Sequence, residues 1–326
     1  MMAMPDFTDV SVLVTGGGGF IGSNLVDDLL ARGARVRVLD NFATGRRENL
    51  THCADRIELI EGDIRDGRTC DETCRDQRFV FHQAALGSVP RSMEDPATTL
   101  DVNTQGTANM LSAARDAGVE RFVFASSSSV YGDSARLPKK EGEEGSPLSP
   151  YATSKSLCEE LADTFSRCYG LMWVGLRYFN IYGPRQDPAG PYAAVIPRFF
   201  AAFLDDKSPL IYGDGEQSRD FTYVADAARA NLLAAGAGDE ACNRAYNVAA
   251  GDRTSVNELA ELVRQAVGSS VTPNYEPPRD GDVKHSLADL EDASALLHYE
   301  AETNLRDGLH LSLPYYTSLQ GRPGVR

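Results

Sequence analysis

The sequence predicts an α/β protein of the Rossmann type, with a doubly wound parallel sheet and a smaller α/β substrate-binding lobe. Three observations support this class. A glycine-rich turn follows an apolar strand near the N-terminus, strands and helices alternate through the first half, and a Tyr-x-x-x-Lys pair lies near the middle. Alternating strands and helices favour a parallel sheet, because each crossover helix returns the chain to the same edge.

The glycine-rich turn is Thr15-Gly-Gly-Gly-Gly-Phe-Ile-Gly22, between a buried strand over 12–14 and a helical pattern over 23–30. Gly16, Gly19 and Gly22 allow a tight turn, a close approach to a pyrophosphate and close helix–strand packing. The helix N-terminus adds amide donors for that anion. The alternative is a plain glycine-rich turn of an α/β protein.

The next strand, over 34–39, ends in Asp40 and Asn41. An acid about 20 residues past the glycine motif accepts hydrogen bonds from the adenosine ribose and repels a 2′-phosphate. We therefore expect NAD rather than NADP as the cofactor.

Further elements follow the same alternation. Strands are expected at 56–60, 79–82, 121–125, 173–177 and 246–248, and helices at 103–117, 151–168 and 223–235. Pro, Gly and Tyr become frequent after residue 183, which indicates a second lobe. The predicted domains are a cofactor domain (1–182 with 223–250) and a substrate domain (183–222 with 251–326). The site is expected beyond the carboxyl ends of the strands, between the lobes.

Composition narrows the function classes. The chain has 326 residues, a net charge of −15 and a pI near 4.8, which argues against nucleic acid or an anionic membrane as partner. Its six cysteines show no metal-ligand spacing, so we expect no metal site and reduced thiols. No apolar leader or membrane-spanning run is evident, and we expect a cytoplasmic protein.

The Tyr-x-x-x-Lys pair is Tyr151 and Lys155, preceded by Ser127. Residues four apart lie on one helix face, and a lysine charge close to a phenol stabilises the phenolate. Such a tyrosine can take or return the proton of a hydroxyl. Alone, the pair is equally typical of a solvated helix face, but the nucleotide loop makes the catalytic interpretation much stronger.

Together these motifs resemble the extended short-chain dehydrogenase/reductases, specifically the bacterial UDP-N-acetylglucosamine 4-epimerases. The resemblance extends from Val12 to about Tyr316. Beyond the motifs above, it rests on His82-Gln-Ala-Ala-Leu86, Ser126-Ser-Ser-Ser-Val-Tyr-Gly132, Leu176-Arg-Tyr-Phe-Asn-Ile-Tyr-Gly-Pro184, Gly213-Asp-Gly-Glu-Gln-Ser-Arg-Asp220 and Arg279-Asp-Gly-Asp-Val-Lys-His-Ser286.

The resemblance implies a catalytic set in which Ser127 holds the sugar 4-hydroxyl, Tyr151 is the base and Lys155 bonds the nicotinamide ribose. Hydride leaves C4, the 4-keto sugar turns over, and hydride returns to the other face. NAD is regenerated in each turnover. The implied cofactor site comprises Gly16, Gly19, Phe20, Ile21, Gly22, Asp40, Asn41, Thr44, Gly45, Asp63, Ile64, Gln83, Ala84, Ala85, Tyr151, Lys155 and Tyr178.

The resemblance also implies how the nucleotide is anchored. Arg219 and Arg279 would clamp the diphosphate, Tyr212 would stack on uracil, and Asn180 would bond near the phosphate–sugar junction. The alternatives are core packing for Tyr212 and an ion pair with Asp220 for Arg219. The full implied substrate set is Gly87, Ser88, Ser127, Ser128, Tyr151, Asn180, Gln186, Ala194, Val195, Tyr212, Arg219, Arg279, Asp282 and Ser286.

Related activities separate at a few positions. Sugar-nucleotide 4,6-dehydratases carry an acid pair where this chain has Ser128 and Ser129, so dehydration is not expected. Six positions resemble the family's sugar-surrounding box: Gly87, Ser127, Tyr151, Asn180, Ala194 and Ser286. Epimerases restricted to plain sugars carry a tyrosine at the last of these, and serine leaves room for a 2-acetamido group. Ser127, Ser286 and Gln186 could bond that amide.

We therefore expect interconversion of UDP-N-acetylglucosamine and UDP-N-acetylgalactosamine, with some activity on UDP-glucose. A UDP-glucose 4-epimerase, a UDP-glucuronate 4-epimerase or decarboxylase, and a catalytically silent NAD-binding scaffold are the alternatives. The resemblance also implies a homodimer through the helices 103–117 and 151–168.

Overall fold

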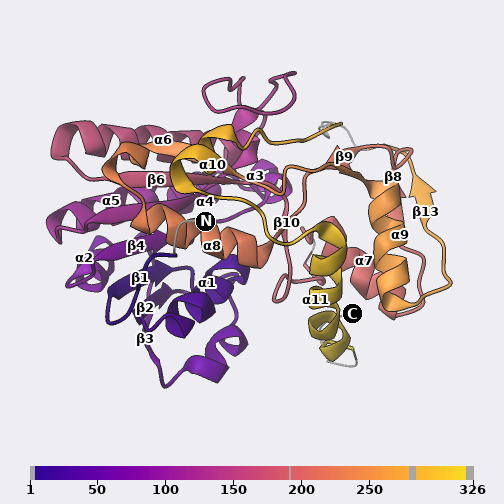
Figure 1. The fold of residues 1–326 in the computed structure, drawn as a ribbon, viewed down its shortest axis with the longest axis horizontal. Helices are drawn as coiled ribbons and strands as arrows, with labels where there is room; N and C mark the ends of the chain where they lie inside the picture. The colour runs from indigo at the N-terminus through magenta and orange to yellow at the C-terminus, as the bar shows by residue number, and fades with distance from the viewer. Residues whose placement is uncertain (1–3, 191, 279–283, 321–326) are drawn as a thin grey trace.

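The computed structural model describes residues 4–190, 192–278 and 284–320. Its centre is a seven-stranded sheet with the order β11-β6-β5-β4-β1-β2-β3 (Figure 1). The strands are β1 (Ser11–Thr15), β2 (Arg35–Asp40), β3 (Ile57–Glu61), β4 (Phe79–His82), β5 (Arg121–Ser127), β6 (Trp173–Tyr178) and β11 (Arg244–Val248). Neighbouring strands are parallel, which confirms the predicted doubly wound sheet.

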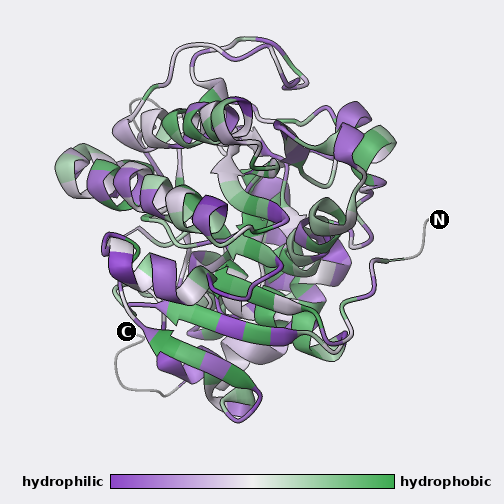
Figure 2. Ribbon diagram, turned by 90° about the vertical axis from the view of Figure 1, so that its left-hand side faces the viewer, coloured by the Kyte–Doolittle hydropathy of each residue, from purple (hydrophilic) through white to green (hydrophobic). Residues whose placement is uncertain are grey.

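Helices cover both faces of this sheet. One face packs against α1 (Phe20–Ala31) and α8 (Val224–Gly236), and the other against α2 (Gly67–Cys74), α5 (Gly106–Asp116) and α6 (Pro150–Tyr169). Alternation along β1 explains the two layers, since Val12 and Val14 join the core with α1, whereas Leu13 joins the core with α5. Figure 2 shows the resulting hydrophobic strands enclosed between helices.

The helix that carries Tyr151 begins where the sequence predicts. Ser149 caps α6 by accepting a hydrogen bond from the Ala152 N–H at 3.1 Å, and Pro150 occupies the first turn. Tyr151 and Lys155 thus lie in the first two turns of α6. The expected helix at 103–117 is instead a π-helical turn, η2 (Asp101–Gln105), that continues into α5.

Shorter elements connect these layers. They are the 3₁₀ turns η1 (Arg47–Cys53), η3 (Ser128–Tyr131) and η4 (Asp239–Ala241), and the helices α3 (Val89–Glu94) and α4 (Pro96–Leu100). None of the helices in the described part of the chain combines the length and apolar character needed to cross a bilayer.

A smaller lobe lies beside the sheet, where Figure 1 shows α7, α9, α11, β8 and β13 together. Its elements are α7 (Val195–Leu204), β8 (Leu210–Tyr212), β9 (Ser218–Arg219), β12 (Thr254–Ser255), α9 (Val256–Val267), β13 (Asn274–Glu276) and α11 (Leu305–Ser318). The short strands β7 (Ile181–Tyr182) and β10 (Thr222–Tyr223) pair with each other next to α8, where the chain passes between the lobes. In contrast, α10 (Glu291–Leu297) packs against β11 and α8, although the sequence assigned its residues to the smaller lobe.

Candidate active site

A cavity of about 610 Å³ opens at the carboxyl ends of β1, β4 and β5. Every residue that the sequence assigns to the cofactor lines it, from Gly16 in the glycine turn to Tyr178 at the end of β6. Ser127, Tyr151 and Lys155 line the same cavity. The fold therefore brings together the two motifs on which the sequence interpretation depends.

The glycine turn has a shape that fits a dinucleotide. Gly16 has a φ of +70°, and a Cβ on Gly22 would lie 2.2 Å from the Gly16 carbonyl oxygen, so the turn tolerates no side chain there. Gly19 is the N-cap of α1 and provides no side-chain cap. The first amides of α1 are thus available to an anion, as a bound pyrophosphate requires.

Asp40 lies at the wall of this cavity, at the end of β2. Its carboxylate accepts hydrogen bonds from the N–H groups of Gly18 at 2.8 Å and Phe42 at 2.7 Å. Burial raises the pKa of this carboxyl group above its usual value. Because each carboxylate oxygen can accept two hydrogen bonds, Asp40 retains acceptor capacity for ribose hydroxyls.

The catalytic candidates are held by backbone contacts. The Lys155 ammonium is buried and donates to the Ala125 carbonyl oxygen at 2.7 Å. Ser127 ends β5 and accepts a hydrogen bond from the Ser129 N–H at 3.1 Å. Tyr151 is half-buried at the cavity wall. A phenol, an ammonium and a hydroxyl that line one dinucleotide cavity are the groups needed to relay a proton during hydride transfer.

A hydrogen-bonded triangle supports the inner end of the cavity. Asn231 of α8 donates to the Tyr178 hydroxyl at 2.8 Å, Tyr178 donates to Gln83 at 3.0 Å, and Gln83 donates back to Asn231 at 2.9 Å. Burial raises the pKa of the Tyr178 phenol, so it stays protonated. The sequence interpretation missed Asn231, since an asparagine within an alanine-rich helix carries no motif.

An ion-pair network centred on the buried Arg177 lies next to Ser126, at the end of β5. Glu159, one turn after Lys155 on α6, accepts two hydrogen bonds from Arg177 of β6, at 3.0 and 2.7 Å. The same carboxylate accepts the Ser126 hydroxyl at 2.5 Å. Glu144, from the loop before α6, pairs with Arg177 as well. This network fixes β5, β6 and α6 relative to one another, and only side-chain contacts across the fold reveal it.

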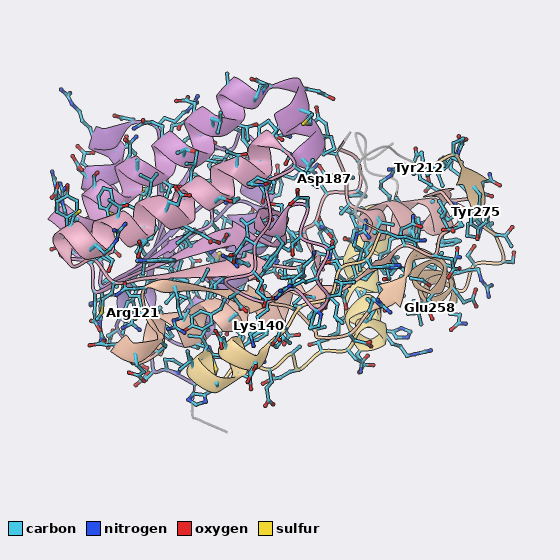
Figure 3. The ribbon with its side chains drawn as sticks, turned by 90° about the horizontal axis from the view of Figure 1, so that it is seen from above. Arg121, Lys140, Asp187, Tyr212, Glu258 and Tyr275 are labelled. Atoms are coloured by element: carbon cyan, nitrogen blue, oxygen red, sulfur yellow. The ribbon has the colours of Figure 1, made fainter. Side chains whose placement is uncertain are left out.

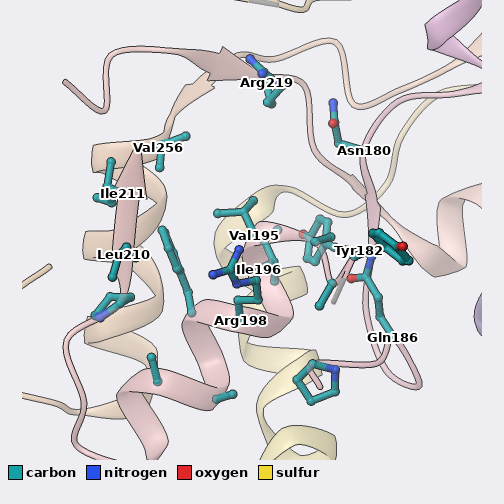
Figure 4. Close-up of a pocket in the computed structure, with 18 of the residues that line it drawn as sticks. Asn180, Tyr182, Gln186, Val195, Ile196, Arg198, Leu210, Ile211, Arg219 and Val256 are labelled. Carbon is teal, nitrogen blue, oxygen red and sulfur yellow. The ribbon is translucent and has the colours of Figure 1, made fainter. Parts of the chain in front are cut away.

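A second cavity, of about 940 Å³, lies between the smaller lobe and residues 87–90 of the larger lobe. Figure 4 shows Asn180, Gln186, Arg198 and Arg219 around it. Three cations, Arg198, Lys207 and Arg219, line this cavity, and its described lining contains no acidic residue. In a chain with a net charge of −15, this concentration of positive charge suits an anionic ligand. Arg198 was not predicted, because no motif surrounds it.

The two cavities meet, and most of the predicted substrate residues lie around the junction. Gly87, Asn180, Gln186 and Ala194 line both. Ser88, Val195, Tyr212 and Arg219 line the second cavity. Ser128 and Ser286 line neither, and the Ser286 N–H bonds the Ser218 carbonyl at 3.1 Å. Arg279 and Asp282 lie outside the described residues. The positions of the other residues agree with the expected site, and the roles of all of them stay predictions.

The Asp220 side chain is held by backbone N–H groups. Its buried carboxylate accepts hydrogen bonds from the N–H groups of Ala250 at 2.9 Å, Gly251 at 3.2 Å and Ala288 at 3.3 Å. Its carbonyl oxygen accepts the Asn180 amide at 2.9 Å. Burial raises the pKa of the carboxyl group to about 6. Asp220 thus anchors the backbone beside Asn180, and Arg219 projects to the second cavity.

The fold and the site define an NAD-binding enzyme with the Tyr-x-x-x-Lys pair of the short-chain dehydrogenases/reductases. Comparison with known proteins narrows this class. The chain belongs to the NAD dependent epimerase/dehydratase family, whose model matches residues 12–249. It is therefore an enzyme with NAD as its cofactor.

Several members of this family are similar in sequence or structure to this chain over nearly its whole length. A UDP-glucose 4-epimerase of Mycolicibacterium smegmatis is 38% identical over 309 residues, covering 93% of this chain and 97% of its own. A UDP-glucose 4-epimerase of Thermotoga maritima, solved with UDP-glucose, has a TM-score of 0.90 at 38% identity, covering 95% and 99%. A UDP-N-acetylglucosamine 4-epimerase of Methanobrevibacter ruminantium, solved with UDP-N-acetylmuramic acid, has a TM-score of 0.91 at 40% identity, covering 95% and 99%.

Proposed function

We propose that this protein inverts C4 of UDP-hexoses, with UDP-N-acetylglucosamine and UDP-N-acetylgalactosamine as its preferred pair. Both epimerase classes occur among its relatives, so the reaction type rests on the family and on the Ser127–Tyr151–Lys155 site. The preference for an acetamido sugar rests on the junction of the two cavities.

The environment of the Gln186 side chain is the observation that most supports the preference for an acetamido sugar. Its Oε1 atom is buried without a hydrogen-bond partner among the described residues, while its Nε2 donates to the Ile181 carbonyl oxygen at 3.1 Å. Gln186 lines both cavities. A buried acceptor left unpaired costs about 1–3 kcal/mol, so a ligand that supplies an N–H group is favoured there. The N–H of a 2-acetamido group supplies that donor.

Small side chains at the junction leave space for the acetyl group. A Cβ on Gly87 would meet no heavy atom within 4 Å, and Ala194 contributes only a methyl group. A plain UDP-hexose would fit the same space, and its 2-hydroxyl can also donate a hydrogen bond. The preference is therefore one of degree, because a pocket excludes an oversized group more sharply than a smaller one.

The reaction follows from the positions of the site residues. NAD, held by the residues that line the first cavity, would supply the hydride acceptor and donor for C4. Tyr151 takes the proton of the 4-hydroxyl and later gives it back, and Ser127 holds that oxygen. The Lys155 ammonium has three protons, one of which Ala125 accepts, so two remain for the phenol and the cofactor ribose.

Inversion also requires the 4-keto sugar to turn while the nucleotide stays bound. We assign the nucleotide to the second cavity, where Arg219 would bind the diphosphate and Tyr212 the uracil ring. Arg198 would add a further cation to this end. The sugar then turns at the junction, between Gly87, Gln186 and Ala194.

The oligomeric state belongs to the same proposal. In Figure 1, α5 and α6 lie side by side on the larger lobe, on the side away from the smaller one. Leu157 and Leu161 of α6 are only partly buried there. We infer a homodimer that covers these helices, and light scattering would give a mass of one chain if this is wrong.

The substrate is tested with purified protein and no added NAD. We expect conversion of UDP-N-acetylglucosamine to its C4 epimer, with a kcat/KM about tenfold above that for UDP-glucose. A higher kcat/KM for UDP-glucose would overturn the preference while leaving the epimerase intact. Turnover of UDP-glucuronate alone would overturn the UDP-hexose substrate class as well as the preference, and its product would show whether C4 is inverted.

A further inference from the structure

A segment of five residues, one of which is Gln186, connects the two cavities. The chain leaves β7 at Tyr182, and residues 183–187, which we call the crossing segment, lead toward α7 in the smaller lobe. Figure 3 shows Asp187 where the two lobes meet. Both residues that flank Gln186 are charged, and each pairs with the cofactor domain rather than with a ligand.

The first ion pair ties the crossing segment to α1. Arg185 donates to Asp27 Oδ2 at 2.5 Å, and its side chain is only 19% exposed. Arg185 has a φ of +72°, a conformation that a residue with a Cβ adopts at a cost. Asn24, also on α1, donates to the Pro184 carbonyl oxygen at 3.2 Å. Because the N-terminal turn of α1 lines the cofactor cavity, this pair ties that wall to the crossing segment.

The second ion pair reaches the opposite wall. Asp187 accepts a hydrogen bond from Arg46 Nη2 at 2.6 Å. Arg46 follows Thr44 and Gly45, which line the cofactor cavity, and its own N–H bonds the Gly18 carbonyl oxygen at 2.9 Å. The crossing segment is thus fastened to both the glycine-turn helix and the loop expected at the adenosine.

We propose that Arg185–Asp27 and Asp187–Arg46 are positioning pairs that retain NAD between turnovers. Both pairs must break before the two walls can separate from the crossing segment. They therefore add to the barrier for cofactor release, and they hold Gln186 at the junction. Epimerisation suits such retention, because each turnover regenerates NAD and none requires its departure.

Asp27 has a competing use that the structure argues against. Its carboxylate, the His52 imidazole and the Cys53 thiol lie within 4.8 Å of one another, a donor set suited to a metal ion. However, Asp27 Oδ1 already bonds His52 Nε2 at 2.6 Å, and Asp27 Oδ2 bonds Arg185. The guanidinium supplies the positive charge that a metal would bring.

The test measures NAD release from the holoprotein rather than turnover. Holoprotein is diluted with an enzyme that consumes free NAD, and the NAD still bound is assayed over time. We expect release to accelerate about threefold in Asp27→Asn or Asp187→Asn and about tenfold in the double variant. Asp28→Asn is the matched control, since it breaks the neighbouring Arg32–Asp28 pair of α1, which does not touch the crossing segment.

Two further measurements separate retention from general stability. Reversing one pair, Arg46→Asp with Asp187→Arg, should restore slow release, whereas either change alone should accelerate it. Added salt should accelerate release from the wild type more than from the Asp27→Asn/Asp187→Asn variant, which has lost both pairs. The proposal is overturned if that variant releases NAD at the wild-type rate, or if Asp28→Asn accelerates release equally. Because NAD release needs no UDP-sugar, failure here leaves the proposed function untouched.

Discussion

The Lys155 ammonium donates a hydrogen bond to the Ala125 carbonyl oxygen at 2.7 Å, which ties the catalytic turn of α6 to the end of β5. Lys155 is only 5% exposed, so this contact fixes a buried charge. The lysine is therefore in position before the cofactor or the sugar arrives. Such preorganisation is what an electrostatic contribution to catalysis requires.

Replacing Lys155 by Met should remove both the charge that assists the proton relay and the hydrogen bond to the Ala125 carbonyl oxygen. We expect kcat to fall at least about 100-fold, because the proton relay loses its charge. The Ala125 carbonyl oxygen would also lose its hydrogen bond from the ammonium, and hydrogen bonds to charged groups contribute about 1.5–3 kcal/mol to the free energy of unfolding. Steady-state kinetics and urea unfolding test the two effects separately. A Lys155→Met protein with wild-type kcat would show that the ammonium is not part of the relay.

Tyr151→Phe should separate chemistry from folding. Among the described residues, the Tyr151 phenol has no hydrogen-bond partner, so its removal should leave the melting temperature unchanged. Activity should fall by about 10²–10⁴, the range for loss of a general base. NAD content, measured after denaturation, should match that of the wild type. A variant that still turns over at the wild-type rate would remove Tyr151 from the mechanism.

The open space at Gly87 predicts that a larger side chain there reduces activity on the two sugars unequally. Its backbone is not in the left-handed region, and a side chain there enters open space. Gly87→Val should therefore fold normally but reduce kcat/KM for UDP-N-acetylglucosamine about tenfold more than for UDP-glucose. Gly67→Val is the matched control, because Gly67 also faces open space but lines neither cavity. Equal losses on both sugars would place the acetyl group elsewhere.

His82 predicts a specific pH dependence of stability. Burial, reinforced by the Lys155 charge, lowers the pKa of His82 from its ordinary 6.5 to about 3. Below pH 6.5 the unfolded chain binds a proton that the folded protein excludes. The free energy of unfolding should therefore fall by ~1.4 kcal/mol for each unit by which the pH is lowered below 6.5. Above that pH the neutral imidazole, between Thr15 at 2.7 Å and Thr107 at 3.1 Å, contributes its full stability.

The variant His82→Gln isolates this contribution. When the pH is lowered from roughly 7 to 5, the free energy of unfolding of this variant should fall by about 2 kcal/mol less than that of the wild type. Urea unfolding at the two pH values measures the difference. Identical pH profiles for the two proteins would mean that His82 titrates normally in the folded state.

Much of the larger lobe was predictable because its signals are local. The apolar run at β1, the glycine turn and the spacing of Tyr151 and Lys155 each depend on residues close in sequence. These signals predicted the parallel sheet, the glycine turn and the Tyr151–Lys155 pair at the cofactor cavity, whereas the resemblance implied most of the other residues that line it. The π-helical turn before α5 was not predictable, since the pattern over 103–117 is equally compatible with an unbroken helix.

The smaller lobe and the contacts between elements were less accessible. Asn231, Arg177 and Glu159 act through partners on other elements, and the pairs Arg185–Asp27 and Asp187–Arg46 join residues more than 100 positions apart. A single sequence contains no signal for such pairings. Ser286 illustrates the limit of carrying a motif over, because the resemblance assigned it to the sugar pocket but it lines neither cavity, and its N–H bonds the Ser218 carbonyl oxygen.

If one bound cofactor both oxidises and reduces C4, the hydrogen of C4 stays on the sugar. NMR tests this directly on the product formed from UDP-N-acetylglucosamine deuterated at C4, in ordinary water and without added NAD. We predict UDP-N-acetylgalactosamine with the deuterium retained at C4, because the hydride returns to the sugar from which it came. Loss of the deuterium to solvent, or no epimer at all, would contradict a mechanism in which the bound cofactor returns the hydride.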